Sequence, residues 1–442
     1  MNLETLASQY DGKLLLKQEL DDSIFNELVN KGLIQKVSGI QKRLGLTTCQ
    51  RCFNQENKYF GKMPMDIIYC RRCIMMGRVS EVEPLYYWLG DSHGVEPIEK
   101  ACQWKGELTP LQQKASDAII DTIERKSRLL INAVCGAGKT EMLYEGIEAA
   151  IAQGLKICIA TPRTDVVREL APRLRRDFPR IQSAALYGDS TELDHGAHLV
   201  IATTHQLLRY RQAFDVIIVD EVDAFPYHKD KSLPQAVKRA AKPEHAMIYL
   251  TATPRTDLKI KSALHLIQTV SIPMRFHGHP LPVPTFKYVR KLENQLLDQK
   301  LPQAIQRWIY NRNGRRYLLF VPTIEMAHHL SRLLNNTPYV FAESPNRKEL
   351  IQQFRNKNIS ALITTTILER GVTFPSIDVA VIKADHHVFD VAALVQISGR
   401  SGRSATDPTG DVTFFYETKT NAMVQAKQYT LKKNKEAKEY MR

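Results

Sequence analysis

A lysine and a threonine, Lys139 and Thr140, follow a short loop that contains Gly136 and Gly138. The apolar run at 129–134 predicts a buried strand before this loop, and a helical pattern at 141–153 follows it. Glycine lets such a loop point successive backbone N–H groups at an anion, and a helix N-terminus adds positive potential. The segment therefore predicts a site for the phosphates of a nucleotide.

Within this segment we expect the Lys139 amine to reach the terminal phosphates and the Thr140 hydroxyl to bind Mg²⁺. Ala133 occupies the position that is usually the first glycine of a P-loop, so a chance match is the alternative. The strand and helix on either side favour the phosphate site. The expected ATP-binding residues of the loop are Ala133, Gly136, Ala137, Gly138, Lys139 and Thr140.

Two acidic residues, Asp220 and Glu221, follow a second apolar strand predicted at 215–219. Phosphoryl transfer to water needs one acid near the Mg²⁺ and another that orients the attacking water. We assign Asp220, together with Thr140, to magnesium and Glu221 to the water. Such a pair is common by itself, but it is more specific downstream of a phosphate loop in the same sheet.

The C-terminal half contributes a glutamine and two arginines, Gln396, Arg400 and Arg403, and has no phosphate loop of its own. Arginines that neutralise charge during phosphoryl transfer raise rates about 10³–10⁵-fold. These two could do so only if both halves of the chain close on one nucleotide. The expected catalytic residues are Lys139, Asp220, Glu221, Gln396, Arg400 and Arg403.

Four cysteines form two C-x-x-C pairs, Cys49 with Cys52 and Cys70 with Cys73. Two such pairs, separated by turn-forming residues, are typical of a closed, structural Zn²⁺ site with four sulfur ligands. Buried free thiols are the alternative, but they would not explain the double spacing. Basic and aromatic residues surround the cysteines, and they could hold a nucleic-acid strand or pack a small core.

From residue 129 onward, strands and helices alternate, which predicts parallel α/β sheets. A second alternation starts near residue 317, after a proline-rich connection at 272–286, and Thr109 and Pro110 predict a helix start. The predicted fold is α/β, with two tandem parallel-sheet domains after a small zinc-binding N-terminal domain. The expected domains are 1–104 (zinc element at about 45–78), 105–278, and 279–442 with a basic C-terminal helix.

Composition narrows the class of protein. A chain of 442 residues suggests two or three domains, and its net charge of +14 favours a polyanionic partner. No apolar run approaches the ~20 residues that span a bilayer, so we expect no transmembrane segment. The first residues lack a basic segment followed by an apolar one, and we expect a soluble intracellular protein.

In this order, the motifs GAGKT, DEVD, TAT and QxxGRxGR resemble superfamily 2 helicases and translocases. That resemblance implies two RecA-like domains, an ATPase stimulated by nucleic acid, and tolerance of Ala133. It also implies that Gln112 contacts adenine and that Gln396 lies near the γ-phosphate. The residues that it assigns to nucleic-acid contact or to coupling are Thr161, Arg163, Thr203, Thr204, Thr251, Thr253, Thr365 and Thr366.

A closer resemblance is to the ComFA late-competence ATPases. The N-terminal cysteines carry it together with the segments TTHQLLR at 203–209, DEVDAFPY at 220–227 and LERGVTF at 368–374. The family implies a cytoplasmic ATPase stimulated by single-stranded DNA, which imports transforming DNA at the inner face of an uptake channel. It further implies a ComFC-type partner and peripheral membrane association.

Three alternatives remain open from the sequence. A replication-restart helicase shares the motifs and the zinc, but in that family the cysteines lie between the helicase halves. An RNA helicase would have the same ATPase core. A zinc-dependent nucleic-acid-binding scaffold with a regulatory ATP site would be expected to have a degraded catalytic set, whereas Lys139, Asp220, Glu221, Arg400 and Arg403 are all present.

Overall fold

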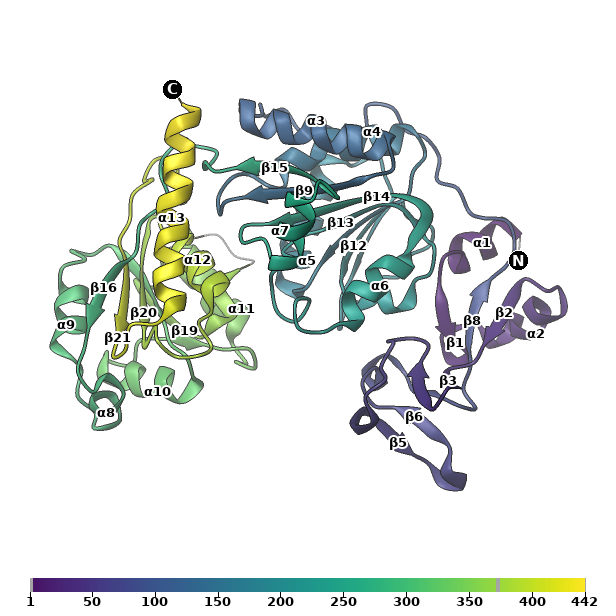
Figure 1. The fold of residues 1–442 in the computed structure, drawn as a ribbon, viewed down its shortest axis with the longest axis horizontal. Coiled ribbons are helices and arrows are strands. Elements are labelled where there is room, and N and C mark those ends of the chain that lie inside the picture. The colour runs from purple at the N-terminus through teal and green to yellow at the C-terminus, as the bar shows by residue number, and fades with distance from the viewer. Residues whose placement is uncertain (1–2, 371–373, 442) are drawn as a thin grey trace. The chain divides into compact units, whose positions relative to one another are not determined.

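A computed structural model describes residues 3–370 and 374–441 of the chain (Figure 1). The chain divides into two compact units. The first comprises Met1–Ile131, Thr140–Thr251 and Arg255–Val270, and the second Asn132–Lys139, Ala252–Pro254 and Ser271–Arg442. Asn132–Lys139 of the phosphate loop and Ala252–Pro254 of the TAT segment thus group with the C-terminal half, whereas Thr140 and Thr251 belong to the first unit.

The N-terminal region of the first unit, purple in Figure 1, is a small antiparallel sheet with two helices. Its strands have the order β1-β8-β2, and Leu28 and Tyr10 are buried in its core. The bounds are α1 Leu3–Tyr10, β1 Leu14–Leu16, α2 Asp22–Asn30, β2 Ile34–Val37 and β8 Leu85–Trp88.

The four cysteines lie in an element built from two small antiparallel sheets. One is the hairpin of β3 (Ile40–Arg43) and β4 (Leu46–Cys49). The other contains β5 (Phe60–Lys62), β6 (Ile68–Cys70) and β7 (Val79–Ser80). Strands β5 and β6 form an antiparallel hairpin in the interval between the two cysteine pairs, where the sequence has turn-forming residues.

A seven-stranded sheet follows, with the order β11-β12-β10-β13-β14-β9-β15. Strands β10, β12 and β13 are apolar and almost wholly buried, as parallel strands covered on both faces must be. The strands are β9 Arg128–Ala133, β10 Ile157–Thr161, β11 Ser183–Leu186, β12 Leu199–Thr203, β13 Phe214–Val219, β14 Ala241–Thr251 and β15 Gln268–Ile272. The helices are α3 Pro110–Glu124, α4 Tyr144–Ala152, α5 Thr164–Asp177, α6 Ser232–Ala240 and α7 Thr256–Ala263.

The second unit contains a six-stranded sheet with the order β16-β21-β20-β17-β19-β18, in which each pair is parallel. Its strands are β16 Thr285–Tyr288, β17 Arg316–Phe320, β18 Tyr339–Val340, β19 Ala361–Thr364, β20 Ile377–Ile382 and β21 Val412–Tyr416. Its helices are α8 Leu292–Leu297, α9 Gln303–Tyr310, α10 Ile324–Leu333, α11 Arg347–Arg355, α12 Val391–Ser398 and α13 Asn421–Tyr440.

These sheets confirm the predicted α/β fold, with a four-cysteine element before it. The helix start is confirmed as well, because Thr109 accepts a hydrogen bond from the Gln112 N–H and Pro110 is the first helical residue. The helix predicted from residue 141 is wrong at its start: a 3-10 turn, Glu141–Leu143, precedes α4. No helix in the described ranges combines the length and apolar composition that crossing a bilayer requires.

Candidate nucleotide, nucleic-acid and metal sites

The phosphate loop has the backbone that an anion-binding loop requires. Gly136 and Gly138 have φ angles of 82° and 72°, in the left-handed region that favours glycine. The Val134 N–H donates to Ile272 O at 3.1 Å, which fixes the loop's start. Ala133 is the last residue of β9 and is fully buried, so an alanine fits there without strain.

The acidic pair lies at the carboxyl end of β13 in the first unit. The Asp220 N–H donates to Ala160 O at 2.8 Å, and the chain reverses at Glu221, whose φ is 54°. This reversal follows the last buried strand residue at once, so both carboxylates lie at the edge where parallel α/β sheets bind ligands.

The acidic segment is tied directly to the TAT segment. Thr251 donates a hydrogen bond from Oγ1 to Asp223 Oδ1 at 2.6 Å, and both side chains are buried. The resemblance implies a coupling role for Thr251, and the structure adds Asp223, the last residue of the DEVD motif, as its hydrogen-bond partner. Thr253, the other predicted residue of this motif, falls in the second unit.

Four predicted nucleic-acid residues meet at the ends of two neighbouring strands of the first unit. Thr161 and Thr203 are paired in register on β10 and β12, and the Thr204 N–H donates to Thr161 O at 2.9 Å. Arg163 immediately precedes α5. Among the described residues, the buried Oγ1 atoms of Thr161 and Thr204 have no hydrogen-bond partner.

In the second unit, Gln396 lies on α12, and Arg400 and Arg403 lie in the loop that follows it. Arg400 is 2% exposed and donates from Nε to Glu369 O at 3.0 Å, while Arg403 donates to Gly399 O at 2.8 Å. Within this unit Cys135 Sγ donates to Gln396 Oε1 at 2.9 Å.

Two further predicted residues of the second unit follow β19: Thr365 is extended and precedes the 3-10 turn Thr366–Glu369, and Thr366 is the first residue of that turn. The 368–374 segment that supports the ComFA resemblance is described only in part, since residues 371–373 lie outside the described residues. Gln112, the predicted adenine contact in the first unit, accepts the Thr109 N–H through Oε1 at 2.8 Å and thereby caps α3.

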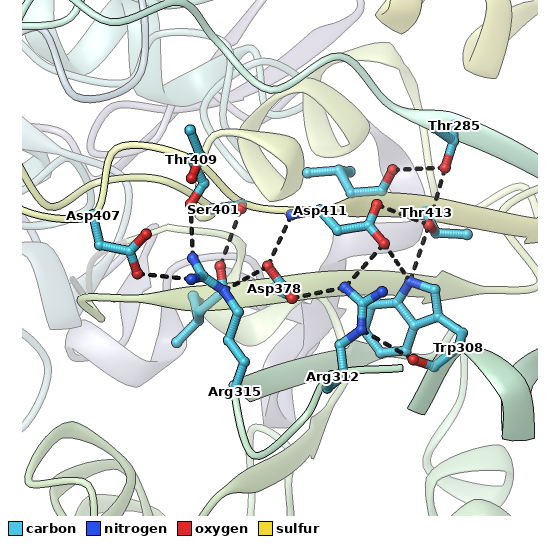
Figure 2. A network of polar contacts seen from close by, with 12 residues as sticks. Thr285, Trp308, Arg312, Arg315, Asp378, Ser401, Asp407, Thr409, Asp411 and Thr413 are labelled. Carbon is cyan, nitrogen blue, oxygen red and sulfur yellow. Dashed lines mark hydrogen bonds and ion pairs between the residues drawn. The ribbon is translucent and has the colours of Figure 1, made fainter. Parts of the chain in front are cut away.

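A partly buried ionic network centred on Asp378 fixes the loop that carries Arg403 (Figure 2). Arg315 bonds Asp378 and Asp407, each at 2.9 Å, and donates to Thr409 O at 2.7 Å. Arg312 bonds the same Asp378 at 2.7 Å. Asp378 is 3% exposed, so these two guanidinium groups supply the charge that a buried carboxylate requires.

Arg275 holds the opposite side of the same loop. It is 1% exposed, donates to Ser401 O at 2.8 Å and also bonds Gly402 O. Burial lowers the pKa of Arg275 to about 10, and the charge of Arg403 adds to this effect. Gly402 has a φ of 65°, and a Cβ there would lie 2.3 Å from Pro408 O. No sequence pattern marks Arg275, Arg312 or Arg315, because their partners lie far away along the chain.

The four cysteine sulfurs fit a tetrahedral zinc ion. All four Sγ atoms lie within 4.8 Å of one another, with Cys49 and Cys73 3.8 Å apart and Cys52 and Cys70 3.6 Å apart. A Zn–S bond of about 2.3 Å places tetrahedral sulfurs about 3.8 Å apart, much farther than a disulfide. All four side chains are buried. Four sulfur ligands would fill a tetrahedral site, which leaves no open coordination position for catalysis.

The basic and aromatic residues around the cysteines could either bind nucleic acid or pack a small core, and the structure decides this for two of them. Arg51 is fully buried and bonds Glu19 and Met76 O, and Phe53 packs under the Arg239 guanidinium at 4.7 Å. These two residues therefore pack the element rather than offer a nucleic-acid surface. Hydrogen bonds among the four thiols, chiefly those with Cys49, lower the pKa of Cys70 and raise the pKa values of Cys52 and Cys73.

Comparison with known proteins identifies the family. Residues 2–87 match "Competence protein ComFA N-terminal domain", residues 105–256 match "Type III restriction enzyme, res subunit", and residues 299–405 match "Helicase conserved C-terminal domain". The chain is 43% identical over 442 residues to "Competence protein ComFA" of Bacillus subtilis (strain 168), covering 98% of this chain and 94% of the relative. The chain belongs to the ComFA family.

A second ComFA relative, from Streptococcus pneumoniae (strain ATCC BAA-255 / R6), is 37% identical over 438 residues, 97% of this chain and 98% of the relative. Among solved structures, "DEAD-box helicase Mss116 bound to ssRNA and UDP-BeF" superposes with a TM-score of 0.53 at 16% identity over 70% of each chain. This likeness confirms the RecA-like fold. The predicted superfamily 2 and ComFA membership is confirmed: the protein is a competence-related superfamily 2 ATPase, whose domains imply ATP and Mg²⁺.

Proposed function

We propose that this ComFA family member is an ATP-dependent single-stranded DNA translocase that drives the import of transforming DNA. The observation that carries the proposal is a complete set of ATPase motifs in a chain that matches ComFA relatives over almost its whole length. A net charge of +14 suits a polyanionic substrate.

In this proposal Lys139 binds the terminal phosphates, Thr140 and Asp220 hold Mg²⁺, and Glu221 orients the attacking water. The metal, when bound, neutralises charge on the phosphates. Arg400 and Arg403, with Gln396 beside them, act on the same nucleotide when the two halves close. The remaining proposed ATP contacts are Gln112, Ala133, Gly136, Ala137 and Gly138.

Movement along DNA would come from loops at the carboxyl ends of the strands. Thr161, Arg163, Thr203 and Thr204 are proposed backbone contacts in the first unit, and Thr365 and Thr366 in the second. A buried hydroxyl without a partner costs about 1–3 kcal/mol, so a phosphate that reached Thr161 or Thr204 would recover this energy. The Thr251–Asp223 hydrogen bond joins the TAT segment, the proposed coupling element, to the segment that follows the acidic pair.

We also propose the biological setting and the domain division. The protein acts in the cytoplasm at the inner face of the membrane, with an uptake channel and a ComFC-type partner, and associates peripherally with the membrane. The domains are proposed as 1–104, 105–278 and 279–442, and the four-cysteine element binds zinc.

A nucleic-acid panel tests the function. We expect ATP hydrolysis to rise at least tenfold with single-stranded DNA, and much less with duplex DNA or RNA of the same length, because the proposed track is one strand. Steady-state phosphate release at a fixed salt concentration measures this. Strongest stimulation by RNA would favour the RNA helicase, and equal turnover with and without nucleic acid would favour the scaffold with a regulatory ATP site.

Arg315 provides a second test, because it anchors the loop that carries Arg403. We expect Arg315→Met to lower the DNA-stimulated kcat by about 3- to 30-fold while the KM for ATP stays within about twofold. The reason is that the substitution loosens the loop that carries Arg403 and leaves the phosphate loop at 133–140 unchanged. Arg332→Met, on the exposed face of α10, is the matched control. A kcat equal to that of the control would show that the network serves stability alone.

A further inference from the structure

The four-cysteine element is packed against the segment that directly follows the acidic pair. Its four cysteines belong to the same buried cluster as Leu233 and Val237 of α6 and Tyr227 of the preceding loop. Helix α6 begins at Ser232, shortly after Glu221. The element and the acidic segment thus share one core in the first unit.

The second cysteine turn is bonded to the start of α6. Arg72, between Cys70 and Cys73, bonds Asp230 at 2.9 Å, and both side chains are less than a quarter exposed. The same Asp230 oxygen accepts hydrogen bonds from Ser232 N at 2.9 Å and Ser232 Oγ at 2.6 Å. Asp230 therefore fixes the first turn of α6 and joins it to the element.

The first cysteine turn is bonded to the end of α6. Arg239 donates to Gln50 O at 2.8 Å and to Leu208 O at 2.7 Å, and its guanidinium lies over the Phe53 ring. Burial lowers the pKa of Arg239 to about 10. Both ends of one helix are thus held, each by a different C-x-x-C turn.

A third link reaches the segment after Thr203 and Thr204. Arg51, in the first cysteine turn, bonds Glu19, and Arg209 donates to the other oxygen of the same carboxylate at 2.6 Å. Arg209 ends the 3-10 turn Gln206–Arg209. Through Glu19 the element is therefore linked to the segment that follows Thr204, in addition to its direct contacts with Asp230 and α6.

The connection from Asp230 back to Glu221 is short and internally bonded. The Ala224 N–H donates to Glu221 O at 2.8 Å, the His228 N–H to Ala224 O at 3.2 Å, and the Asp230 N–H to Pro226 O at 2.9 Å. Because backbone hydrogen bonds close each of these consecutive turns, we expect a displacement of Asp230 to displace Glu221 as well.

We infer that the four-cysteine element is a brace for the acidic pair: Arg72 and Arg239 are positioning residues that hold α6 and, through the 220–231 loop, the carboxylates of Asp220 and Glu221. The inference rests on the proposed function for its catalytic consequence. A metal that fixes both cysteine turns fixes both attachment points at once, so the state of the element is coupled to ATP hydrolysis.

Asp230→Asn and Arg72→Ala test the brace, with Arg71→Ala as the matched control on the same turn. Asparagine keeps an oxygen for Ser232 but loses the charge that pairs with Arg72. We expect both test variants to keep the wild-type zinc content, to exchange amide hydrogens faster at 220–240, and to lose about 3- to 30-fold in kcat at unchanged KM for ATP. Exchanging the charges in Arg72→Asp/Asp230→Arg should recover part of the loss.

Hydrogen exchange is measured on the zinc-loaded full chain without nucleotide, so it tests the brace even if the wild-type protein proves to have no DNA-stimulated ATPase. Wild-type exchange rates at 220–240 in Asp230→Asn would overturn the brace. Faster exchange with an unchanged kcat would overturn the positioning role. If Arg72→Ala loses zinc, Asp230→Asn decides alone, because its substitution lies outside the cysteine element.

Discussion

Lys139→Ala is expected to abolish ATP hydrolysis, lowering kcat by at least about 100-fold. The reason is electrostatic: Lys139 is the cation that follows the glycine loop, and removing one preorganised donor from a phosphoryl-transfer site costs about 10²–10³ in rate. Binding of single-stranded DNA should stay measurable, because the threonine loops at the ends of β10 and β12 are untouched. Phosphate release and fluorescence anisotropy of a labelled strand measure the two properties.

The control for this experiment is Lys126→Ala. Lys126 is an exposed lysine that pairs with Glu244 at 2.6 Å, and it precedes β9, whereas the glycine loop follows the other end of that strand. The Lys126→Ala variant should hydrolyse ATP at the wild-type rate. Full ATPase activity in Lys139→Ala would remove the nucleotide assignment of 133–140, whereas loss of both hydrolysis and DNA binding would indicate that the variant had misfolded.

Cys70→Ser, or removal of zinc by a chelator, is expected to unfold the four-cysteine element. Structural zinc sites contribute about 10–16 kcal/mol of apparent binding energy, which is folding energy for a small element with little core of its own. Since the cysteines share a buried cluster with α6, the loss should also lower the melting temperature of the first unit. Metal analysis, calorimetry and limited proteolysis at 40–80 measure the effect.

Cys102→Ser is the matched control, because Cys102 is half-buried and lies outside the sulfur cluster. The Cys102→Ser variant should bind about one zinc ion per chain, as the wild type should. A Cys70→Ser protein with the wild-type melting curve and proteolysis pattern would show that the four thiols do not hold a structural metal.

The sequence alone predicted the chemistry proposed for the chain, because this chemistry depends on contiguous motifs. Lys139 and Thr140 after a glycine loop, Asp220 with Glu221 after a strand, and two C-x-x-C pairs each place their groups through local backbone geometry. The alternation of apolar runs likewise predicted two parallel-sheet domains. Short strands such as β15 and β16 escaped prediction, since most of their residues are exposed or only partly buried and carry no apolar pattern.

Tertiary structure decided which distant residues support these motifs. Asp378 needs Arg312 and Arg315 because a buried carboxylate must be paired, and no sequence pattern shows which arginine fills that need. The same holds for Arg72 with Asp230 and for Arg239 with Gln50, which join cysteine turns to a helix far along the chain. Local spacing fixes the reacting groups, whereas long-range packing fixes the ion pairs that hold them, and only folding brings those partners together.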